Sequence, residues 1–373
     1  MRAGDLPEFD ADDERQARVA WSALAEPGDH AAQRLVAEVG PVRALRRVLA
    51  GSGDDRWRVR LSELNPRRDL RTLRRFDGRL VIPGDAEWPL TFTALGDEAP
   101  FCLYVRGPLD LSTVTVRSAA IVGARACTPY GEHVAAELGD GCALRQISVV
   151  SGAAYGIDGA AHKGALAGGG ATVAVLACGI DRSYPKGHEK LIERVGAVGA
   201  VMSEVPPGRA PTRWRFVERN RLIAALARVT VVVEAGHHSG ARGTAMRAQR
   251  LGLPVAAVPG PVTSPSSYGC HRLIREDGAI CVTSADELAE LAAPMGEFLA
   301  DPPPEPPGPF QQLGPAERRV VDALPARSPA SIGSIIRAAG LVDEDVVSAL
   351  QRLAGLGLAV QEGTGWRREG ATG

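Results

Sequence analysis

The sequence predicts an α/β fold: a Rossmann-like, doubly wound parallel sheet with a helical N-terminal domain and a C-terminal winged-helix domain. From Arg79 onward, apolar runs bounded by Gly and Pro do not alternate with polar residues, which is typical of strands covered on both faces. Helical segments separate most of these runs. Repeated strand, helix, strand units with short links favour a parallel sheet.

Each expected element of the sheet follows from this pattern. The apolar runs predict strands within 80–83, 101–107, 118–123, 147–152, 171–179, 229–236 and 254–260. The segments between them predict helices at 129–145, 157–167, 187–195, 216–227 and 241–251.

The chain divides into four expected parts. Short helices around the Gly40-Pro41 break predict a helical domain of the helix-hairpin-helix or SAM-like type at 1–76, ahead of the Rossmann-like core at 77–298. A proline-rich stretch predicts a semi-rigid linker at 299–314. Three helical segments and two short strand-like pieces predict a winged-helix domain at 315–373, a module that binds duplex DNA or mediates protein contacts. The helical segments lie at 315–324, 331–339 and 343–356.

Composition narrows the class of protein. At 373 residues, 45% hydrophobic and 23% charged, the chain resembles soluble globular proteins. No apolar run reaches the roughly 18 to 20 residues of a membrane span, and the acidic start carries no apolar signal segment, so we expect a cytoplasmic protein with no membrane span. The 6 cysteines form no C-x-x-C pair, and we expect incidental thiols and no metal site.

The formal net charge of −1 hides two basic segments. Residues 209–275 carry eleven arginines against Glu218 and Glu234, and residues 43–75 carry eleven arginines against four acidic residues. Clustered positive charge releases counterions from a phosphate backbone, which indicates polyanion binding. An arginine-rich solvated surface explains either segment alone equally well.

Ligands of an open parallel sheet bind at the carboxyl ends of its strands, where this chain carries unusual loops. In the first, Gly123 ends a strand, Arg125 follows, and Thr128-Pro129 supplies an N-cap and a first-turn proline. An arginine at this place can meet a phosphate at the helix N-terminus. The alternative is a surface arginine beside an ordinary capped helix.

The second loop lies in VVSGAAYGIDGAAH, residues 149–162. Ser151 and Gly152 form the turn, and Gly156 permits close backbone approach. Asp158 and His162 share one helix face and can hydrogen-bond to each other, which fits a catalytic or a structural pair. Because no G-x-S-x-G elbow and no third group completes a triad, the pattern favours the structural role, and we expect no catalytic residue.

Two further strand ends, 231–248 and 256–274, lead into loops rich in Ser and Gly. In the former, Glu234 is followed by a loop that ends in Thr244, so backbone N–H groups and a hydroxyl can cradle an anion. Neither place holds a G-x-G-x-x-G fingerprint or a P-loop lysine, and we expect no cofactor.

One helical segment adds polar residues near these loops. In ERNRLIAALA, Arg219 and Arg221 flank Asn220, a pattern that can contact phosphates and a base edge together. Several convergent anion loops without an obvious general base favour nucleic-acid binding over turnover.

Seven motifs resemble those of the DprA/Smf DNA-processing proteins in order and spacing: IVGARACTPYG, VVSGAAYGIDGAAH, VAVLACGIDRSYP, SEVPPG, ERNRLIAAL, VVVEAGHHSGARGTA and VPGPVTSPSSYGCHRLI. The match is strong over roughly residues 79–290 and weaker at the flanking parts. The resemblance implies a protein that binds single-stranded DNA, protects incoming DNA in natural transformation and helps load the RecA recombinase. It also implies a homodimer.

The resemblance assigns DNA-binding and phosphate-binding residues as well. It places Arg125, two residues after Gly123, on single-stranded DNA. The matching positions in the family's other loops are Ser151, Gly152, Gly156 and Asp158, then Asn220 and Arg221, then Ser239, Gly240 and Thr244. Tyr155 stands where many members have a basic residue, and its ring offers a stacking face for a base. His271 and the Ala241-Arg242 pair also depart from the family pattern.

These residues predict that phosphates lie over the strand ends near Gly123, Ser151 and Ser239, held by Arg125, Arg221 and backbone donors, with slight sequence preference. The alternative is a small-molecule enzyme that resembles nucleotide phosphoribohydrolases of the cytokinin-activating type. Those enzymes carry a Pro-Gly-Gly-x-Gly-Thr loop with a catalytic glutamate, whereas SGARGTAMRA has no acid. A duplex-binding regulator that uses the winged helix alone leaves the Rossmann loops unexplained.

Overall fold

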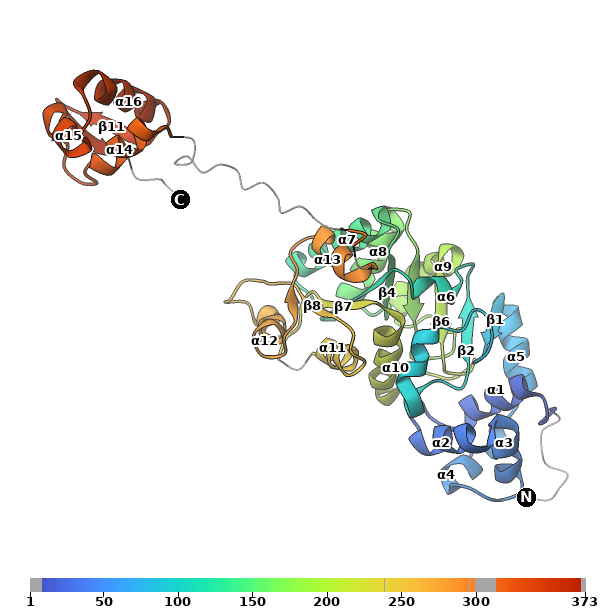
Figure 1. Ribbon diagram of the computed structural model, residues 1–373. Helices are drawn as coiled ribbons and strands as arrows, with labels where there is room; N and C mark the ends of the chain where they lie inside the picture. Colours follow the sequence, from blue (N-terminus) through green and yellow to red (C-terminus); the bar gives the residue numbers. More distant parts are fainter. Residues whose placement is uncertain (1–8, 238, 295, 299–312, 370–373) are drawn as a thin grey trace. The chain divides into compact units, whose positions relative to one another are not determined.

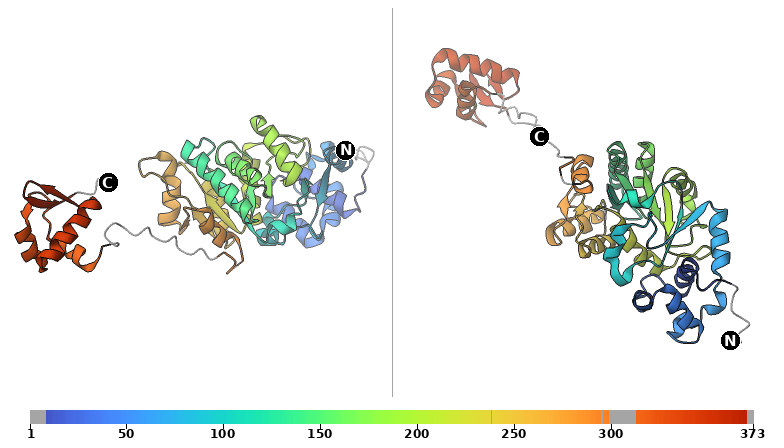
Figure 2. Two further views of the ribbon diagram at one scale, coloured as in Figure 1. Left: turned by 90° about the horizontal axis from the view of Figure 1, so that it is seen from above. Right: turned by 45° about the vertical axis from the view of Figure 1, so that its right-hand side comes forward.

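Helices cover both faces of one sheet that runs through the larger part of the chain (Figures 1 and 2). The structure is a computed structural model that describes residues 9–237, 239–294, 296–298 and 313–369. The chain divides into two units, residues 1–300 and 301–373, each with its own apolar core.

Among the described residues, the first unit has a nine-stranded sheet in the order β1-β2-β6-β5-β4-β3-β7-β8-β9. The strands are β1 Gly78–Val81, β2 Leu103–Arg106, β3 Ser118–Val122, β4 Ser148–Ser151, β5 Thr172–Val175, β6 Ala200–Ser203, β7 Val229–Val232, β8 Val255–Ala257 and β9 Ile280–Cys281. The pairs from β6 through to β9 are parallel, which confirms the predicted mostly parallel α/β sheet. Strand β2 pairs antiparallel with both β1 and β6, an edge that the sequence did not predict.

Strand β6 lies where the sequence analysis expects no strand. The chain passes from α9 (Glu189–Val198) into β6 through Gly199 alone. The end of α9 and the whole of β6 form one continuous stretch of small and apolar residues. The sequence therefore shows no change of pattern where the helix ends and the strand begins.

The alternating side chains of β3 explain why the sheet is covered on both faces. Ala119 and Ile121 belong to the core on one face, and Ala120 and Val122 to the core on the other. The first face packs against α7 (Pro129–Leu144), α8 (Ile157–Ala167) and α13 (Ala285–Ala292), and the second against α10 (Arg213–Leu226), α11 (Ala241–Arg250) and α12 (Tyr268–Glu276). Strands buried on both faces read as unbroken apolar runs, as the sequence shows.

Helix α10 begins three residues before the predicted start at 216. Thr212 caps it, because its Oγ1 accepts a hydrogen bond from the Arg215 backbone N–H at 3.2 Å. The extra turn brings Arg213 into the helix. By contrast, α7, α8 and α11 begin at the predicted residues.

The N-terminal helices pack into the edge of the sheet. They are α1 Glu14–Leu24, α2 His30–Val39, α3 Pro41–Leu49, α4 Asp55–Arg58 and α5 Pro66–Arg75. Trp21 is fully buried among them, at 5.3 Å from Trp57 and 5.8 Å from Phe101 between ring centroids. A smaller core joins Leu73 of α5 to Tyr104 of β2. The domain boundary expected at 76/77 stays a prediction, since these helices share cores with the sheet.

Short helical segments complete the first unit: η1 Leu61–Glu63, η2 Leu90–Glu98, α6 Leu111–Val114, η3 Lys186–His188 and η4 Pro265–Ser267. Within the described chain, no helix combines the length and hydropathy needed to cross a membrane. The described residues also contain no group of three or more His, Cys, Asp or Glu side chains arranged to hold a metal ion.

The second unit is a helical bundle with a small sheet. Its elements are α14 Pro315–Ala323, β10 Ala330–Ser331, α15 Ile332–Ala339, α16 Asp343–Gly355, β11 Ala359–Glu362 and β12 Gly365–Arg368. The strands pair antiparallel in the order β10-β12-β11 around a core that includes Ile335 and Leu350. The assignment of this unit as a winged helix stays a prediction. Of the expected linker at 299–314, residues 299–312 lie outside the described residues.

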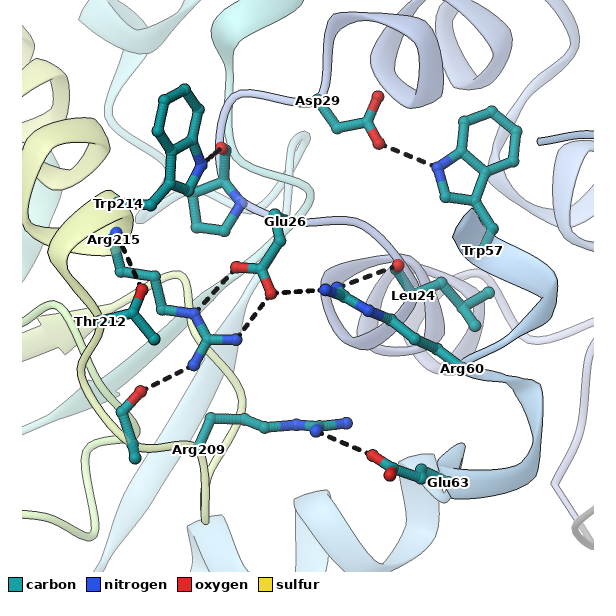
Figure 3. A network of polar contacts seen from close by, with 12 residues as sticks. Leu24, Glu26, Asp29, Trp57, Arg60, Glu63, Arg209, Thr212, Trp214 and Arg215 are labelled. Carbon is teal, nitrogen blue, oxygen red and sulfur yellow. Dashed lines mark hydrogen bonds and ion pairs between the residues drawn. The ribbon is translucent and has the colours of Figure 1, made fainter. Parts of the chain in front are cut away.

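A polar network attaches the N-terminal helices to α10 (Figure 3). The Glu26 carboxylate accepts two hydrogen bonds from Arg215, both at 2.9 Å, and one from Arg60 at 2.8 Å. Beside it, Arg209 pairs with Glu63 at 3.0 Å. The network therefore holds the first turn of α10 against residues far away in the sequence.

Charge removal at Glu26 is expected to change the pH dependence of stability. Burial raises the pKa of Glu26, but hydrogen bonds and charges from Arg215 and Arg60 outweigh this effect and lower the pKa below 4.5. A carboxylate with a lowered pKa stabilises the fold above its unfolded pKa and loses that contribution as the pH falls through its folded pKa. Between about pH 7 and about pH 3, we expect the unmodified protein to lose about 1 to 2 kcal/mol more stability than Glu26→Gln.

Urea unfolding of both proteins across this pH range measures the two losses of stability. The contributions of the carboxylates that both proteins share cancel in the difference. Equal losses in the two proteins would show that the Glu26 pairs do not contribute to folding.

Candidate functional site

A cleft of about 1010 Å³ lies where the strand order reverses. Strand β4 pairs with β3 on one side and β7 pairs with β3 on the other, so the loops that follow these strands diverge and leave a crevice at their carboxyl ends. The residues that line it are Val122, Gly123, Ala124, Arg125, Ala126, Ala154, Asp158, Tyr184, Pro211, Thr212, Arg213, Phe216, Val217, Arg219, Asn220, Ile223, Gly236, Ser239, Gly240, Ala241, Thr244, Pro265 and Ser266. Of the predicted site residues, Gly123, Arg125, Asn220, Ser239, Gly240 and Thr244 are brought together here.

Arg125 is exposed at the rim of the cleft. Its Cζ lies 4.7 Å from the centroid of the Phe216 ring, a cation–π distance. Gly123 is necessary for this loop, because a Cβ there would lie 2.4 Å from Cγ1 of Ile157. Among the described residues Arg125 has no ion pair, so its guanidinium is available to an anion.

Glu234, at the end of β7, is occupied by the neighbouring loops. Its carboxylate accepts hydrogen bonds from the Thr128 backbone N–H at 2.9 Å, from the Thr128 hydroxyl at 2.6 Å and from the Ser266 hydroxyl at 3.1 Å. It is buried, and its role is to fix the start of α7 next to the cleft.

The prediction that Arg221 holds a phosphate is wrong. Arg221 is 1% exposed, and its guanidinium makes a bidentate pair with Glu204, with both N–O distances at 2.6 Å. Residues two apart on a helix point about 200° away from each other, so Arg219 and Arg221 cannot face the same side. Arg219 faces the cleft instead.

Arg219 is a buried cation beneath the cleft. Its Nη1 donates to the Val175 carbonyl, and its Nε is buried without a hydrogen-bond partner in the described structure. Burial lowers the pKa of Arg219 to about 10, and the Asp158 carboxyl opposes that shift. The side chain therefore stays charged at neutral pH and has unused hydrogen-bonding capacity.

Asp158 and Gly152 position Arg219. The Gly152 backbone N–H donates to the Asp158 carboxylate at 3.1 Å, while burial raises the pKa of Asp158 despite the nearby Arg219. A Cβ at Gly152 would lie 2.0 Å from Nη1 of Arg219. Gly152 is required because the guanidinium lies directly against its backbone.

The expected hydrogen bond between Asp158 and His162 is absent from the described structure. His162 is fully buried, and its Nδ1 is 2.7 Å from the Thr172 hydroxyl. Burial lowers the pKa of His162 to about 3, so the ring is neutral. Ser151 is also buried, and its hydroxyl donates to the Ile121 carbonyl at 2.7 Å. The expected contact between its side chain and a phosphate is therefore wrong.

Tyr155 lies outside the set of residues that line the cleft. Its hydroxyl accepts a hydrogen bond from the Gly187 backbone N–H at 3.2 Å, and its half-exposed ring meets His188 edge-on at 4.8 Å between centroids. Gly156 has a φ of 77°, and a Cβ there would lie 2.3 Å from the Ala124 carbonyl oxygen, which agrees with its expected role in close backbone approach.

Sequence reasoning missed the aromatic wall of the cleft and one of its cations. Phe216 and Tyr184 line it, with ring centroids 5.5 Å apart. Arg213 is exposed at the start of α10, and it forms no ion pair with any of the described residues. The usable signal was helical spacing, because Arg213, Phe216 and Arg219 are three residues apart and share one face.

Most arginines of the basic segment 209–275 are paired with acids. The ion pairs are Arg209–Glu63, Arg215–Glu26, Arg221–Glu204, Arg242–Asp277, Arg247–Glu218 and Arg272–Glu276. Several of these acids come from outside the segment, so its net charge in sequence overstates its charge in the fold. From this segment Arg213 and Arg219 remain at the cleft, where they join Arg125.

The sequence profile of the family described as DNA recombination-mediator protein A matches residues 79–293. A protein from Mycobacterium tuberculosis named putative DNA processing protein DprA is 47% identical over 370 residues, which cover 93% of each chain.

Two solved structures are also similar. The X-ray structure of DNA processing protein A from Streptococcus pneumoniae has a TM-score of 0.62 and 31% identity, and the match covers 76% of this chain and 97% of that one. DNA processing protein A from Helicobacter pylori, described as having a unique single-stranded DNA binding mode, has a TM-score of 0.52 and 27% identity over 58% of this chain and 95% of that one.

Arg221→Ala is expected to destabilise the fold. Removal of Arg221 leaves the Glu204 carboxylate buried without its partner, which costs about 3 to 5 kcal/mol of unfolding free energy. The double variant Arg221→Met with Glu204→Met removes both charges and should recover most of the loss. Urea unfolding measures all three proteins. Unchanged stability of Arg221→Ala would contradict the buried pair.

Proposed function

Because this chain belongs to the family of DNA recombination-mediator protein A, as its motifs predict, we propose that it binds single-stranded DNA, protects incoming DNA and assists RecA loading in natural transformation and recombination. The observation that carries the proposal is the cleft at the switch point of the sheet, which combines Arg125, Arg213 and Arg219 with two aromatic rings. The single-stranded DNA binding mode described for the Helicobacter pylori protein supports it.

In this proposal, phosphates bind the cations of the cleft. Arg125 and Arg213 are exposed and meet the backbone directly, whereas Arg219 supplies charge from below. Thr244 and the loop of Ser239 and Gly240 stand at the N-terminal end of α11, where helix N–H groups and the helix dipole favour an anion.

Bases stack on the aromatic wall of the same cleft. Phe216 and Tyr184 lie next to the arginines, with Arg125 over one face of the Phe216 ring, and stacking of a base on an aromatic ring tolerates every base. Tyr155 offers a further face outside the cleft. Sequence preference is therefore slight, because phosphate contacts and stacking carry little base information.

The protein acts by binding rather than by turnover. The acidic and imidazole groups near the cleft, Asp158, His162 and Glu234, are each buried and held by structural hydrogen bonds. A phosphoribohydrolase activity is not favoured, since α11 carries no acidic residue to serve as the catalytic glutamate. The proposal further includes a homodimer, which the family resemblance implies. It also includes a cytoplasmic location and a winged helix at 315–373, which the sequence pattern predicts.

The direct test of the proposal is fluorescence anisotropy with a labelled single strand and the matching duplex, at several salt concentrations. We expect tighter binding of the single strand and a steep negative salt slope. Equal or tighter binding of the duplex would refute the proposal.

Arg125→Ala and Arg213→Ala are each expected to weaken single-strand binding for all base compositions. Each loses one phosphate contact, so the slope of log affinity against log salt should fall by about 0.7. Arg228→Ala is the matched control, because Arg228 is exposed but precedes β7 at the opposite edge of the sheet. The same anisotropy titration applies, and an unchanged slope in both cleft variants would place the phosphates elsewhere.

Gly152→Ala is expected to weaken DNA binding without unfolding the protein. The new Cβ takes the space of the Arg219 guanidinium, which is the flexible end of its side chain and can move away. We expect about a threefold to tenfold loss of single-strand affinity, the scale of one ordinary hydrogen bond. Thermal unfolding provides the folding control. If a folded Gly152→Ala protein keeps full affinity, Arg219 takes no part in the site.

A further inference from the structure

One exposed face of α5 consists of arginines. Arg67, Arg71, Arg74 and Arg75 are all exposed, and at 100° per residue they fall within about 100° of one another around the helix axis. Within the described residues none of the four has an ion pair. The opposite face of the helix is buried through Pro66, Asp69 and Leu73 and packs beside β1.

A hollow of about 520 Å³ adjoins the C-terminal end of this helix. Arg75 and the partly exposed ring of Phe76 line it together with Arg106 at the end of β2. The Nε of Arg106 is buried without a hydrogen-bond partner in the described structure. Asp77 and Glu193 also line the hollow, so five arginines stand against two carboxylates over the helix face and the hollow.

From these observations we propose that the α5 edge, defined as Arg67, Arg71, Arg74, Arg75, Phe76 and Arg106, is a second binding surface for single-stranded DNA. Unpaired arginines around an exposed aromatic ring are the chemistry that holds a phosphate backbone and stacks a base. The proposal rests on the proposed function, because its occupant is the continuation of the strand that fills the cleft.

The sheet order sets the length of DNA that can reach both surfaces. Strand β1, beside α5, is five strand positions away from β3, which leads into the cleft. At about 4.8 Å per strand this separation across the sheet is about 24 Å. The hollow lies at the edge opposite the cleft, because Gly78 at the start of β1 pairs with Arg106, and Arg106 pairs with Val201 near the start of β6. The four-residue strands therefore add about 13 Å, and the distance becomes about 27 Å. With phosphates about 3.4 Å apart in a stacked strand, about eight nucleotides cover this distance. Short strands therefore occupy one surface, and long strands occupy both.

The test uses the full chain with strands of about 6 and about 30 nucleotides, on either side of that bridging length. In the triple variant Arg67→Glu, Arg71→Glu, Arg74→Glu, we expect affinity for the long strand to fall about tenfold or more and its salt slope to decrease by about 2, with little change for the short strand. The matched control changes the same three positions to Lys, which keeps the charge and should keep the salt slope and most of the affinity.

Each other outcome has a definite meaning. If the glutamate variant binds the long strand as the unmodified protein does, the α5 edge is not a DNA surface. If it weakens both strands equally, the edge is not a separate surface, and the proposal is overturned. If the short strand does not bind the unmodified protein, or if it binds Arg125→Ala equally well, the cleft is not a DNA-binding site. That result would refute the proposed function rather than the role of the α5 edge alone.

Discussion

The buried pair between Arg221 and Glu204 fixes the orientation of α10, because it decides which face of the helix meets the sheet. Glu204 directly follows β6, so the pair ties one face of the helix to the sheet, and Arg221 also donates to the Glu98 carbonyl at 2.7 Å. With that face fixed inward, Phe216 and Arg219 have to face the cleft. The Glu26 network secures the first turn of the same helix from the outside. One helix thus supplies both the stability of the core and the wall of the site.

Pairing decides which charges can bind a ligand. An arginine matched by a carboxylate contributes to folding, whereas one left unmatched gives a local positive potential that attracts phosphates. Among the described residues, two groups of unmatched arginines lie at the cleft around Arg125 and on the exposed face of α5. Carboxylates that could serve as catalysts are instead buried and hydrogen-bonded, as Asp158 and Glu234 are. This division is what favours a binding protein over an enzyme.

The strands and helices of the central sheet could be predicted from sequence because double-sided burial leaves long apolar runs, as in β3 and β7. The antiparallel edge could not be predicted, because an apolar run does not indicate the direction of a strand. Strand β6 could not be predicted either, because Gly199 alone separates it from α9. Arg125, which follows a strand end, lies at the cleft as expected, and its contact with DNA stays a prediction. Site prediction failed for Arg221, because motif matching ignores that neighbouring arginines on a helix face opposite sides.

The proposed function depends on single-stranded DNA lying in the cleft against Phe216 and Tyr184. Photo-cross-linking tests it most directly: a strand of about 30 nucleotides with 5-iododeoxyuridine at single positions is irradiated with the full chain, and the attached peptides are identified by mass spectrometry. The account predicts cross-links to these two rings. Cross-links confined to residues 313–369 would contradict it and place DNA binding on the second unit.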